Sequence, residues 1–353
     1  MSYPWFTAAE WLQVTKHEKP AEVIPAMARA LCALPPPYPA VTEEAALRDF
    51  TALARRPADE LLTPAAAAAY RHQTVSPGRC LGLLTTATQG LLAAERFTAP
   101  ARWRGKHQFC PSPWARWRDP WYMEGLLREL WARPTKGVTP VSLRSLLLVR
   151  GHTSAQFRPA AAKALYDYFS ARRVLDVCAG WGGRLVGFAA SRHGEEYLGV
   201  DTNPEMHGRY EQMAALCCPR RRTEFVMAPA QQCRLAERRA GYFDLAFTSP
   251  PYAYCEQYPG TVTPVAPVEA WEDSFLAPVL HETWACLAPG GVLLLNLPNV
   301  KVRQVVLDLA SAAHRVMGGV RADFIGSFAL GLHARKGAVA GAEPVWAWRK
   351  AHA

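Results

Sequence analysis

Short apolar runs alternate with helix-like stretches from about residue 173 to the end of the chain. The first five runs predict buried strands, at residues 173–179, 197–201, 223–227, 243–248 and 291–296. Helical spacing predicts helices between most of them, over residues 184–193, 205–216 and 269–287. Buried strands that alternate with helices predict a parallel sheet with helices on both faces.

Two later apolar runs, residues 323–330 and 343–348, are joined by a glycine-containing segment without a helical pattern. Because no crossover helix separates them, they predict an antiparallel hairpin, which we expect at the sheet edge. The whole pattern predicts a doubly wound α/β fold. Its sheet is mostly parallel and seven-stranded, and it ends in the antiparallel hairpin.

The first part of the chain has a different pattern. Residues 43–54 and 64–71 are rich in strong helix formers with helical apolar spacing, and prolines punctuate these stretches. Strand–helix alternation and internal repeats are not evident there. We therefore predict a mainly helical N-terminal domain over residues 1–145, followed by the sheet domain over residues 146–353.

Composition narrows the class of protein. Of the 353 residues, 50% are hydrophobic and 20% are charged, which is typical of a globular protein and excludes a disordered or collagen-like chain. No run of eighteen apolar residues predicts a membrane helix, and the N-terminus lacks a signal-peptide pattern. The nine cysteines are scattered without metal-ligand spacing. We expect a cytoplasmic protein with reduced thiols, no bound metal and no membrane contact.

The charge balance favours a polyanionic partner. Net charge is +10, and residues 1–150 hold 19 Lys and Arg against 12 Asp and Glu. Residues 151–353 hold 21 against 18, so the surplus lies mainly in the N-terminal part. Such a surplus suits DNA, because neutralised phosphates release counterions. A GC-rich genome would also produce this arginine-rich composition, so charge alone leaves the partner open.

A glycine-rich loop follows the first predicted strand and reads Asp176-Val-Cys-Ala-Gly180-Trp-Gly182-Gly183-Arg184. Glycines let a backbone turn sharply and approach a ligand, and the following helix presents its N-terminus to that ligand. Asp201 ends the next strand, 25 residues after Asp176, where a carboxylate can accept from both ribose hydroxyls of an adenosine. The loop has neither the spacing of a dinucleotide site nor the lysine of a triphosphate site.

These features resemble the class I S-adenosylmethionine-dependent methyltransferases. The resemblance implies S-adenosylmethionine as cofactor, with Gly180 and Gly182 against its methionine part and Asp201 on its ribose. The cofactor-binding residues that it implies are Asp176, Cys178, Ala179, Gly180, Gly182 and Asp201. Members of the family commonly place an acid near the adenine, where this chain offers Gln231 or Gln232 instead. A glycine turn in a fold that binds nothing is the structural alternative.

Ser249-Pro250-Pro251-Tyr252 follows the fourth predicted strand, 73 residues after Asp176. An exocyclic base amine is a poor nucleophile because its lone pair is delocalised into the ring. Two oxygen acceptors would favour a pyramidal nitrogen with a localised lone pair, and an aromatic ring would stack on the extruded base.

The turn resembles the (Asp/Asn/Ser)-Pro-Pro-(Tyr/Phe/Trp) motif of amino-methyltransferases, and its serine form is most associated with N4-cytosine DNA methyltransferases. The resemblance implies four catalytic residues, which are Ser249, Pro250, Pro251 and Tyr252. Adenine stays open as the target, since serine and aspartate both accept hydrogen bonds there. C5-cytosine chemistry is disfavoured, because it uses a thiolate that usually follows a proline, and none of the cysteines does.

Two further segments are candidates. Ahead of the first strand, Arg158 could pair with the cofactor carboxylate and Phe157 could pack beside the cofactor, although a helix-entry turn is an equal alternative. Residues 102–122 mix basic and aromatic side chains, which suits phosphate contacts and base stacking. The nucleic-acid-binding candidates in this segment are Arg102, Arg104, Lys106, Arg116 and Arg118, with His107 when protonated. A tryptophan-rich packing segment is the alternative.

The combined hypothesis is an S-adenosylmethionine-dependent, site-specific DNA methyltransferase acting on a flipped base, with cytosine N4 preferred. We expect DNA as partner, and a cognate restriction nuclease if the enzyme belongs to a restriction–modification system. Three alternatives remain. They are an N6-adenine enzyme, an amino-methyltransferase for RNA or protein glutamine, and an inactive nucleic-acid-binding subunit on the same fold.

Overall fold

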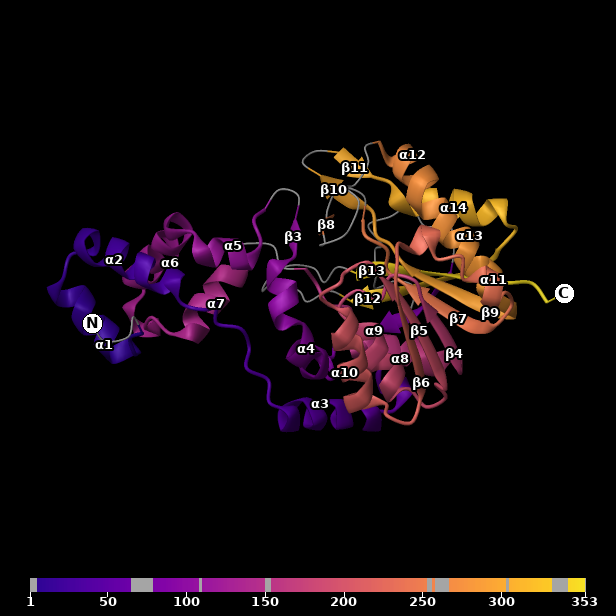
Figure 1. Cartoon of the computed structure of the whole chain (residues 1–353), viewed down its shortest axis with the longest axis horizontal. Coiled ribbons are helices and arrows are strands. Elements are labelled where there is room, and N and C mark those ends of the chain that lie inside the picture. Colours follow the sequence, from indigo (N-terminus) through magenta and orange to yellow (C-terminus); the bar gives the residue numbers. More distant parts are fainter. Residues whose placement is uncertain are drawn as a thin grey trace. The chain divides into compact units, whose positions relative to one another are not determined.

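The computed structural model describes residues 5–64, 79–107, 110–149, 154–252, 256–257, 267–302, 305–331 and 342–352. Contacts divide the chain into two compact units, coloured by sequence in Figure 1. Unit 1 comprises Met1–Ala40 and Ala99–Ala155, and unit 2 comprises Val41–Thr98 and Gln156–Ala353. Residues 41–98 thus cluster with the sheet, whereas the division drawn from the sequence placed them in the N-terminal domain.

Unit 2 is built on a nine-stranded sheet. In spatial order its strands are β1 (Leu62–Thr63), β2 (Cys80–Leu84), β12 (Asp323–Gly331), β13 (Ala342–Arg349), β9 (Leu287–Asn296), β7 (Phe243–Thr248), β4 (Arg173–Asp176), β5 (Glu196–Asp201) and β6 (Arg222–Met227). β13 runs antiparallel to both of its neighbours, and β1 is antiparallel to β2, whereas the other pairs are parallel. The seven strands from β6 to β12 are the predicted methyltransferase sheet with its C-terminal hairpin, which confirms the fold class.

One expectation about the sheet was wrong. The β12–β13 hairpin does not lie at the edge, because β2 pairs with β12 in parallel and β1 lies beyond β2. β2 is short and contains Gly82, so its apolar run carries little strand signal. A Cβ at this glycine would lie 2.7 Å from a side-chain methyl carbon of Leu62 and 3.1 Å from the carbonyl oxygen of Thr63, both on β1.

Helices cover both faces of the sheet, as the alternating pattern predicts (Figure 1). One face carries α8 (Pro159–Tyr168), α9 (Gly183–Ala190) and α10 (His207–Cys217), and the other carries α11 (Ala236–Arg239), α13 (Ala277–Cys286) and α14 (Leu309–Gly319). On the first face the ring of Phe188 lies 5.3 Å from that of Tyr197. The second face buries the main core, which includes Leu175, Val177, Leu198, Val200, Ala246, Leu293, Trp284 and Met317.

Shorter elements complete unit 2. They are α3 (Glu43–Arg55), the start of α4 (Leu91–Arg104), α12 (Val268–Trp271), β8 (Glu256–Gln257), β10 (Val300–Val302), β11 (Val305–Leu307), the 3₁₀ turns Ala58–Glu60 and Ala230–Gln232, and the π-helical turn Glu272–Leu276. Asp49 on α3 accepts from the backbone N–H of Leu92 at 2.8 Å, and Arg209 on α10 donates to the Phe97 carbonyl at 2.5 Å. These bonds tie α3 and the start of α4 to the sheet unit.

Unit 1 is mainly helical. It contains α1 (Ala8–His17), α2 (Pro20–Ala33), the end of α4, β3 (Lys106–His107), α5 (Pro113–Arg118), α6 (Pro120–Ala132), a 3₁₀ turn (Pro134–Lys136) and α7 (Pro140–Val149). Polar caps begin three of the helices, since Thr7, Ser112 and Asp119 each accept from a backbone N–H of the first turn. Its core is rich in tryptophan and leucine and includes Trp11, Trp103, Trp117, Leu127 and Leu143.

No helix in the described part of the chain is long and apolar enough to cross a membrane.

Candidate functional site

The two predicted motifs lie at the ends of neighbouring strands. β4 and β7 pair in parallel, the glycine loop follows β4, and the Ser249–Tyr252 turn follows β7. From β4 the chain proceeds to β5 and β6 on one side, and from β7 it proceeds to β9 on the other. The sheet order therefore reverses between β4 and β7. In open α/β sheets, ligands bind at the carboxyl ends of the strands at this reversal.

The backbone of the glycine loop needs glycine at three positions. Gly180 and Gly182 have φ values of +59° and +74°, which favour glycine. At Gly183 a Cβ would lie 1.9 Å from the carbonyl oxygen of Phe157, so no side chain fits there. Gln156 donates to the Trp181 carbonyl at 3.3 Å. The segment ahead of the first strand therefore lies directly against the loop.

Asp201 joins the end of β5 to the glycine loop. Its Oδ2 accepts from the N–H of Gly180 at 2.7 Å, and its Oδ1 accepts from the N–H of Asn203 at 2.9 Å. Burial raises the pKa of this carboxyl, and the two N–H donors oppose that rise. Each oxygen holds a second lone pair, so the carboxylate can still accept from a ligand hydroxyl. The hydroxyl of Tyr210 donates to the Gly180 carbonyl and holds the loop from another side.

Asp176 is fully buried beneath the loop rather than open to solvent. Its carboxylate accepts from Arg184 at 2.7 and 3.1 Å and from the hydroxyl of Tyr197 at 2.7 Å. Arg184, at the start of α9, also donates to the carbonyl of Cys178. Asp176 therefore supports the backbone of the loop by way of Arg184, which bonds to both. Sequence reasoning missed Arg184, although a charged residue in the first turn of an apolar helix was a signal for it.

Cys178 and Ala179 contribute packing and backbone to the loop. Burial, together with the charges of Asp201 and Asp176, raises the pKa of the Cys178 thiol far above its usual range. A thiol in this state is protonated at neutral pH and is no nucleophile. Ala179 is buried, and its N–H donates to the Val200 carbonyl at 2.8 Å.

The proline turn brings two hydroxyls and an amide together. The Oγ of Ser249 lies 3.4 Å from Oδ1 of Asn296, the hydroxyl of Tyr252 lies 3.4 Å from the same Oδ1, and the two hydroxyls lie 3.5 Å apart. Pro250 is buried behind them. Asn296 ends β9 and is 3% exposed. Sequence reasoning did not select Asn296, although a polar residue that ends a continuous apolar strand could have identified it.

Phe157 and Arg158 lie in different surroundings. The Phe157 ring packs edge-on against Phe247 with centroids 5.1 Å apart, and the Arg184 guanidinium lies 5.7 Å from its centroid. Arg158 donates to the carbonyl of Gly331, at the end of β12. Burial lowers the pKa of Arg158, and the nearby charge of Glu343 opposes that change. The described bonds thus place Arg158 beside β12 and β13, and its pairing with a cofactor carboxylate stays a prediction.

The basic segment of unit 1 divides into buried and exposed arginines. Arg116 is 2% exposed and donates to the Leu147 carbonyl at 2.7 Å, so this structure leaves it no access to a phosphate. Arg102 is half-buried and donates to the Ser154 carbonyl at 3.3 Å. Arg104 and Arg118 are exposed. The side chain of Lys106 lies outside what the structure describes.

The aromatic residues of this segment divide in the same way. Trp103 and Trp117 belong to the unit 1 core, which agrees with the packing alternative for these two. Trp121, in contrast, is 73% exposed, with its ring 5.0 Å from that of Tyr122. The Arg118 guanidinium lies 5.2 Å from the ring of Trp114.

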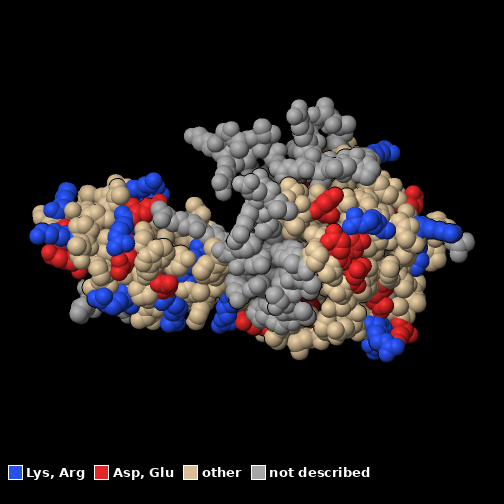
Figure 2. Space-filling model, turned by 90° about the horizontal axis from the view of Figure 1, so that it is seen from above, with Lys and Arg blue, Asp and Glu red and all other residues tan. Residues whose placement is uncertain are grey.

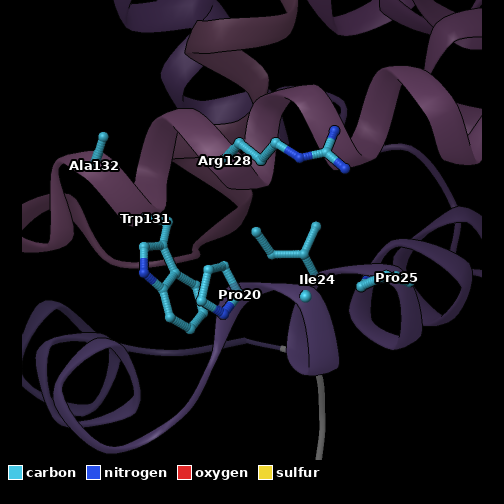
Figure 3. A pocket seen from close by; sticks show the side chains of 7 residues that line it. Pro20, Ile24, Pro25, Arg128, Trp131 and Ala132 are labelled. Carbon is cyan, nitrogen blue, oxygen red and sulfur yellow. The ribbon is translucent and has the colours of Figure 1, made fainter.

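Unit 1 also holds a pocket of about 410 Å³ between α2 and α6, shown in Figure 3. Its lining is mostly apolar and consists of Pro20, Ala21, Ile24, Pro25, Arg128, Trp131 and Ala132. Arg128 pairs with Glu124 at 2.6 Å, so its charge is already compensated. The pocket lacks the groups that would carry chemistry. Throughout the described residues, no three His, Cys, Asp or Glu side chains gather as a metal site requires.

Known proteins resemble this chain over part of its length. Residues 148–283 match the family model described as conserved hypothetical protein 95. Similar solved structures include 1,6-didemethyltoxoflavin-N1-methyltransferase from Burkholderia thailandensis, at 17% identity over 54% of this chain and 76% of that chain, with a TM-score of 0.35. A SAM-dependent methyltransferase from Methanosarcina mazei has 15% identity over 51% and 93% of the two chains, with a TM-score of 0.35. TrmN from Thermus thermophilus has 18% identity over 57% and 51%, with a TM-score of 0.38.

No curated protein matches the sequence significantly. The family match spans under half of the chain, and the structural likenesses are distant. The reaction therefore has to be argued from the site itself.

Proposed function

We propose that this chain transfers a methyl group from S-adenosylmethionine to the exocyclic amine of a base in DNA, with cytosine N4 as the preferred position. The observation that carries the proposal is the pairing of β4 with β7, which puts the glycine loop and the Ser249–Tyr252 turn side by side. A cofactor on the loop and a base on the turn would meet where the sheet order reverses.

The loop fits such a cofactor. A Cβ on Gly180 would lie 3.7 Å from the carbonyl oxygen of Cys178, an ordinary van der Waals contact, so the protein does not crowd this position. Asp201 keeps lone pairs for ribose hydroxyls while it holds the loop N–H. Gly180, Gly182 and Asp201 would therefore hold the cofactor, while Asp176 and Arg184 set the shape of the loop.

S-adenosylmethionine, when bound, would supply a sulfonium methyl group for the amine nitrogen, with the carbon–sulfur electron pair kept by sulfur and one amine proton released to water. The chain's own contribution is to position and polarise that amine. Ser249 and a backbone carbonyl of the proline turn would accept its two hydrogens and localise the nitrogen lone pair. Tyr252, whose hydroxyl lies beside Asn296, would stack on the base.

Unit 1 is the candidate DNA-recognition part. It holds 13 Lys and Arg against 6 Asp and Glu, whereas unit 2 holds 27 against 24. Figure 2 shows blue Lys and Arg patches spread over the face of unit 1, on the left of the view. Exposed Arg104 and Arg118 suit phosphate contacts, and the exposed ring of Trp121 suits stacking on a base.

Transfer of labelled methyl groups tests this function. The protein is incubated with labelled S-adenosylmethionine and, separately, with duplex DNA, single-stranded DNA, RNA and a glutamine-containing peptide. We expect label in DNA, loss of labelling with Ser249→Ala, and unchanged labelling with Ser274→Ala, which alters an exposed serine on another segment. Label only in RNA or peptide would assign the substrate to those alternatives. No transfer to any substrate by a folded protein that binds DNA would favour the inactive subunit.

A further inference from the structure

A serine and an aspartate at the first position of the turn differ in the hydrogen bonds that they can form. A carboxylate can only accept hydrogen bonds, whereas a serine hydroxyl carries one proton and two lone pairs. Ser249 accepts a hydrogen bond from the substrate amine most strongly when its own hydroxyl proton is directed away from that amine. A nearby group that accepts and cannot donate would enforce that orientation.

Asn296 has the geometry of such a group. Its Nδ2 donates to the carbonyl oxygen of Pro344 at 3.1 Å. Because a carbonyl oxygen can only accept, this bond fixes the orientation of the amide and leaves Oδ1 facing the turn. Oδ1 then lies 3.4 Å from the hydroxyls of both Ser249 and Tyr252, and it has a lone pair for each. The side chain is nearly fully buried, so water does not compete freely for these bonds.

We propose that Asn296 is a positioning residue, whose side-chain carbonyl takes the Ser249 proton so that the serine oxygen presents its lone pairs to the substrate amine. The inference rests on the proposed amine methylation. It adds the residue that orients the Ser249 hydroxyl, an orientation that a carboxylate at this position would not require. Asn296 acts through Ser249 and Tyr252 and does not itself touch the substrate. The Pro344 carbonyl is the anchor that keeps the amide in the required orientation.

A double-mutant cycle on methyl transfer tests the proposal. Asn296→Ala is compared in the natural background and in the Ser249→Asp background, with the single-turnover rate and DNA affinity measured for each. In the natural background we expect the rate to fall on the order of tenfold, the effect of about one hydrogen bond, with little change in DNA affinity. In the Ser249→Asp background the same change should cost less than about threefold, since a carboxylate has no proton to redirect.

Asn299→Ala is the matched control. Asn299 lies three residues along the chain, where it donates to Asp308 and accepts from Ala310, each at 3.0 Å. It should leave the methyl-transfer rate unchanged although it removes two side-chain hydrogen bonds. Equal losses of rate from Asn296→Ala in both backgrounds would overturn the proposal and assign Asn296 to structural support alone.

A second cycle separates this inference from the proposed function. Thermal unfolding of Ser249→Ala, Asn296→Ala and the double variant is measured without substrate. If the two side chains share a hydrogen bond, the double variant should lose less in Tm than the two single variants together. Additive losses would show that Ser249 and Asn296 do not share a hydrogen bond, even if methyl transfer is observed. Absence of amine methylation with non-additive losses would reject the proposed reaction while leaving the bond established.

Discussion

The ion pair beneath the glycine loop should be among the most important polar contacts in unit 2. Asp176 and Arg184 are almost fully buried and joined at 2.7 Å. Removing one partner leaves the other charge buried without compensation, which typically costs about 3–5 kcal/mol. Since about 1 kcal/mol shifts the Tm of a domain of about 150–250 residues by about 2–4 °C, Arg184→Leu should lower Tm by roughly 6–20 °C.

The control is an exposed pair on the same unit. Arg172 and Glu195 lie 2.6 Å apart, with side chains 64% and 47% exposed. Arg172→Leu should leave the Tm nearly unchanged, since solvent screens exposed pairs. The double variant Arg184→Leu with Asp176→Asn should lose less than the two single variants together, because it leaves no uncompensated charge.

Calorimetry or denaturant unfolding measures all of these variants, and cofactor titration then reports on the loop. We expect Arg184→Leu to weaken S-adenosylmethionine binding in the folded fraction, because Arg184 also holds the Cys178 carbonyl. An Arg184→Leu protein as stable as the Arg172→Leu protein would refute the argument, and so would strictly additive losses in the double variant.

Further predictions concern binding and reactivity. Asp201→Ala should weaken S-adenosylmethionine binding by about 1.5–3 kcal/mol in calorimetry, through loss of a charge-assisted acceptor. Cofactor affinity should also decrease as the pH is lowered and the Asp201 carboxylate is protonated. Because burial raises the pKa of Asp201, this decrease should begin at a higher pH than for an ordinary aspartate, and Asp201→Asn should remove it. Arg104→Ala with Arg118→Ala should lower the log–log salt slope of DNA binding by about one unit per lost phosphate contact, whereas Arg116→Ala should lower Tm instead. Cys178→Ala should keep the methyl-transfer rate within about threefold, since a half-buried thiol with a raised pKa takes no chemical part, and a larger loss would implicate the thiol.

The main sheet was predictable because its strands are mostly apolar and have helices between most of them. The β4, β5, β7 and β9 strands keep this pattern although Asp244 lies within β7 and Gly290 within β9. β2 was not predictable in the same way. Its five residues include Gly82, and it pairs with β12, which follows more than 200 positions later in the chain. Such a short segment acquires strand structure from its neighbour rather than from its own pattern.

Residues that look alike in the sequence differ in how deeply they are buried in the structure. Arg116 and Arg118 lie two positions apart on α5, yet the first donates into the interior and the second is exposed. Because an α-helix has about 3.6 residues per turn, side chains two positions apart point to nearly opposite sides, and charge alone does not show which side faces the core. Asp176 illustrates the same limit, since its place before the glycines resembles a ligand position while its carboxylate is bonded to Arg184.

Asn296 shows where more could have been predicted. It ends the apolar run of β9, at the carboxyl edge where ligands bind, and a polar residue there is a signal in its own right. Its contact with Ser249 depends on β7 and β9 pairing in parallel, with Thr248 opposite Leu295. That register brings the ends of the two strands level, and the sequence pattern does not specify it.

The position of the methyl group on the base tests the central proposal most directly. DNA is incubated with the protein and isotopically labelled S-adenosylmethionine, digested to nucleosides and analysed by mass spectrometry. The proposal predicts labelled N4-methylcytosine with the natural protein and none with Ser249→Ala. Labelled N6-methyladenine would keep the amine chemistry and change only the base. Labelled 5-methylcytosine, or no labelled nucleoside from a folded protein that binds the cofactor, would contradict amine methylation of DNA.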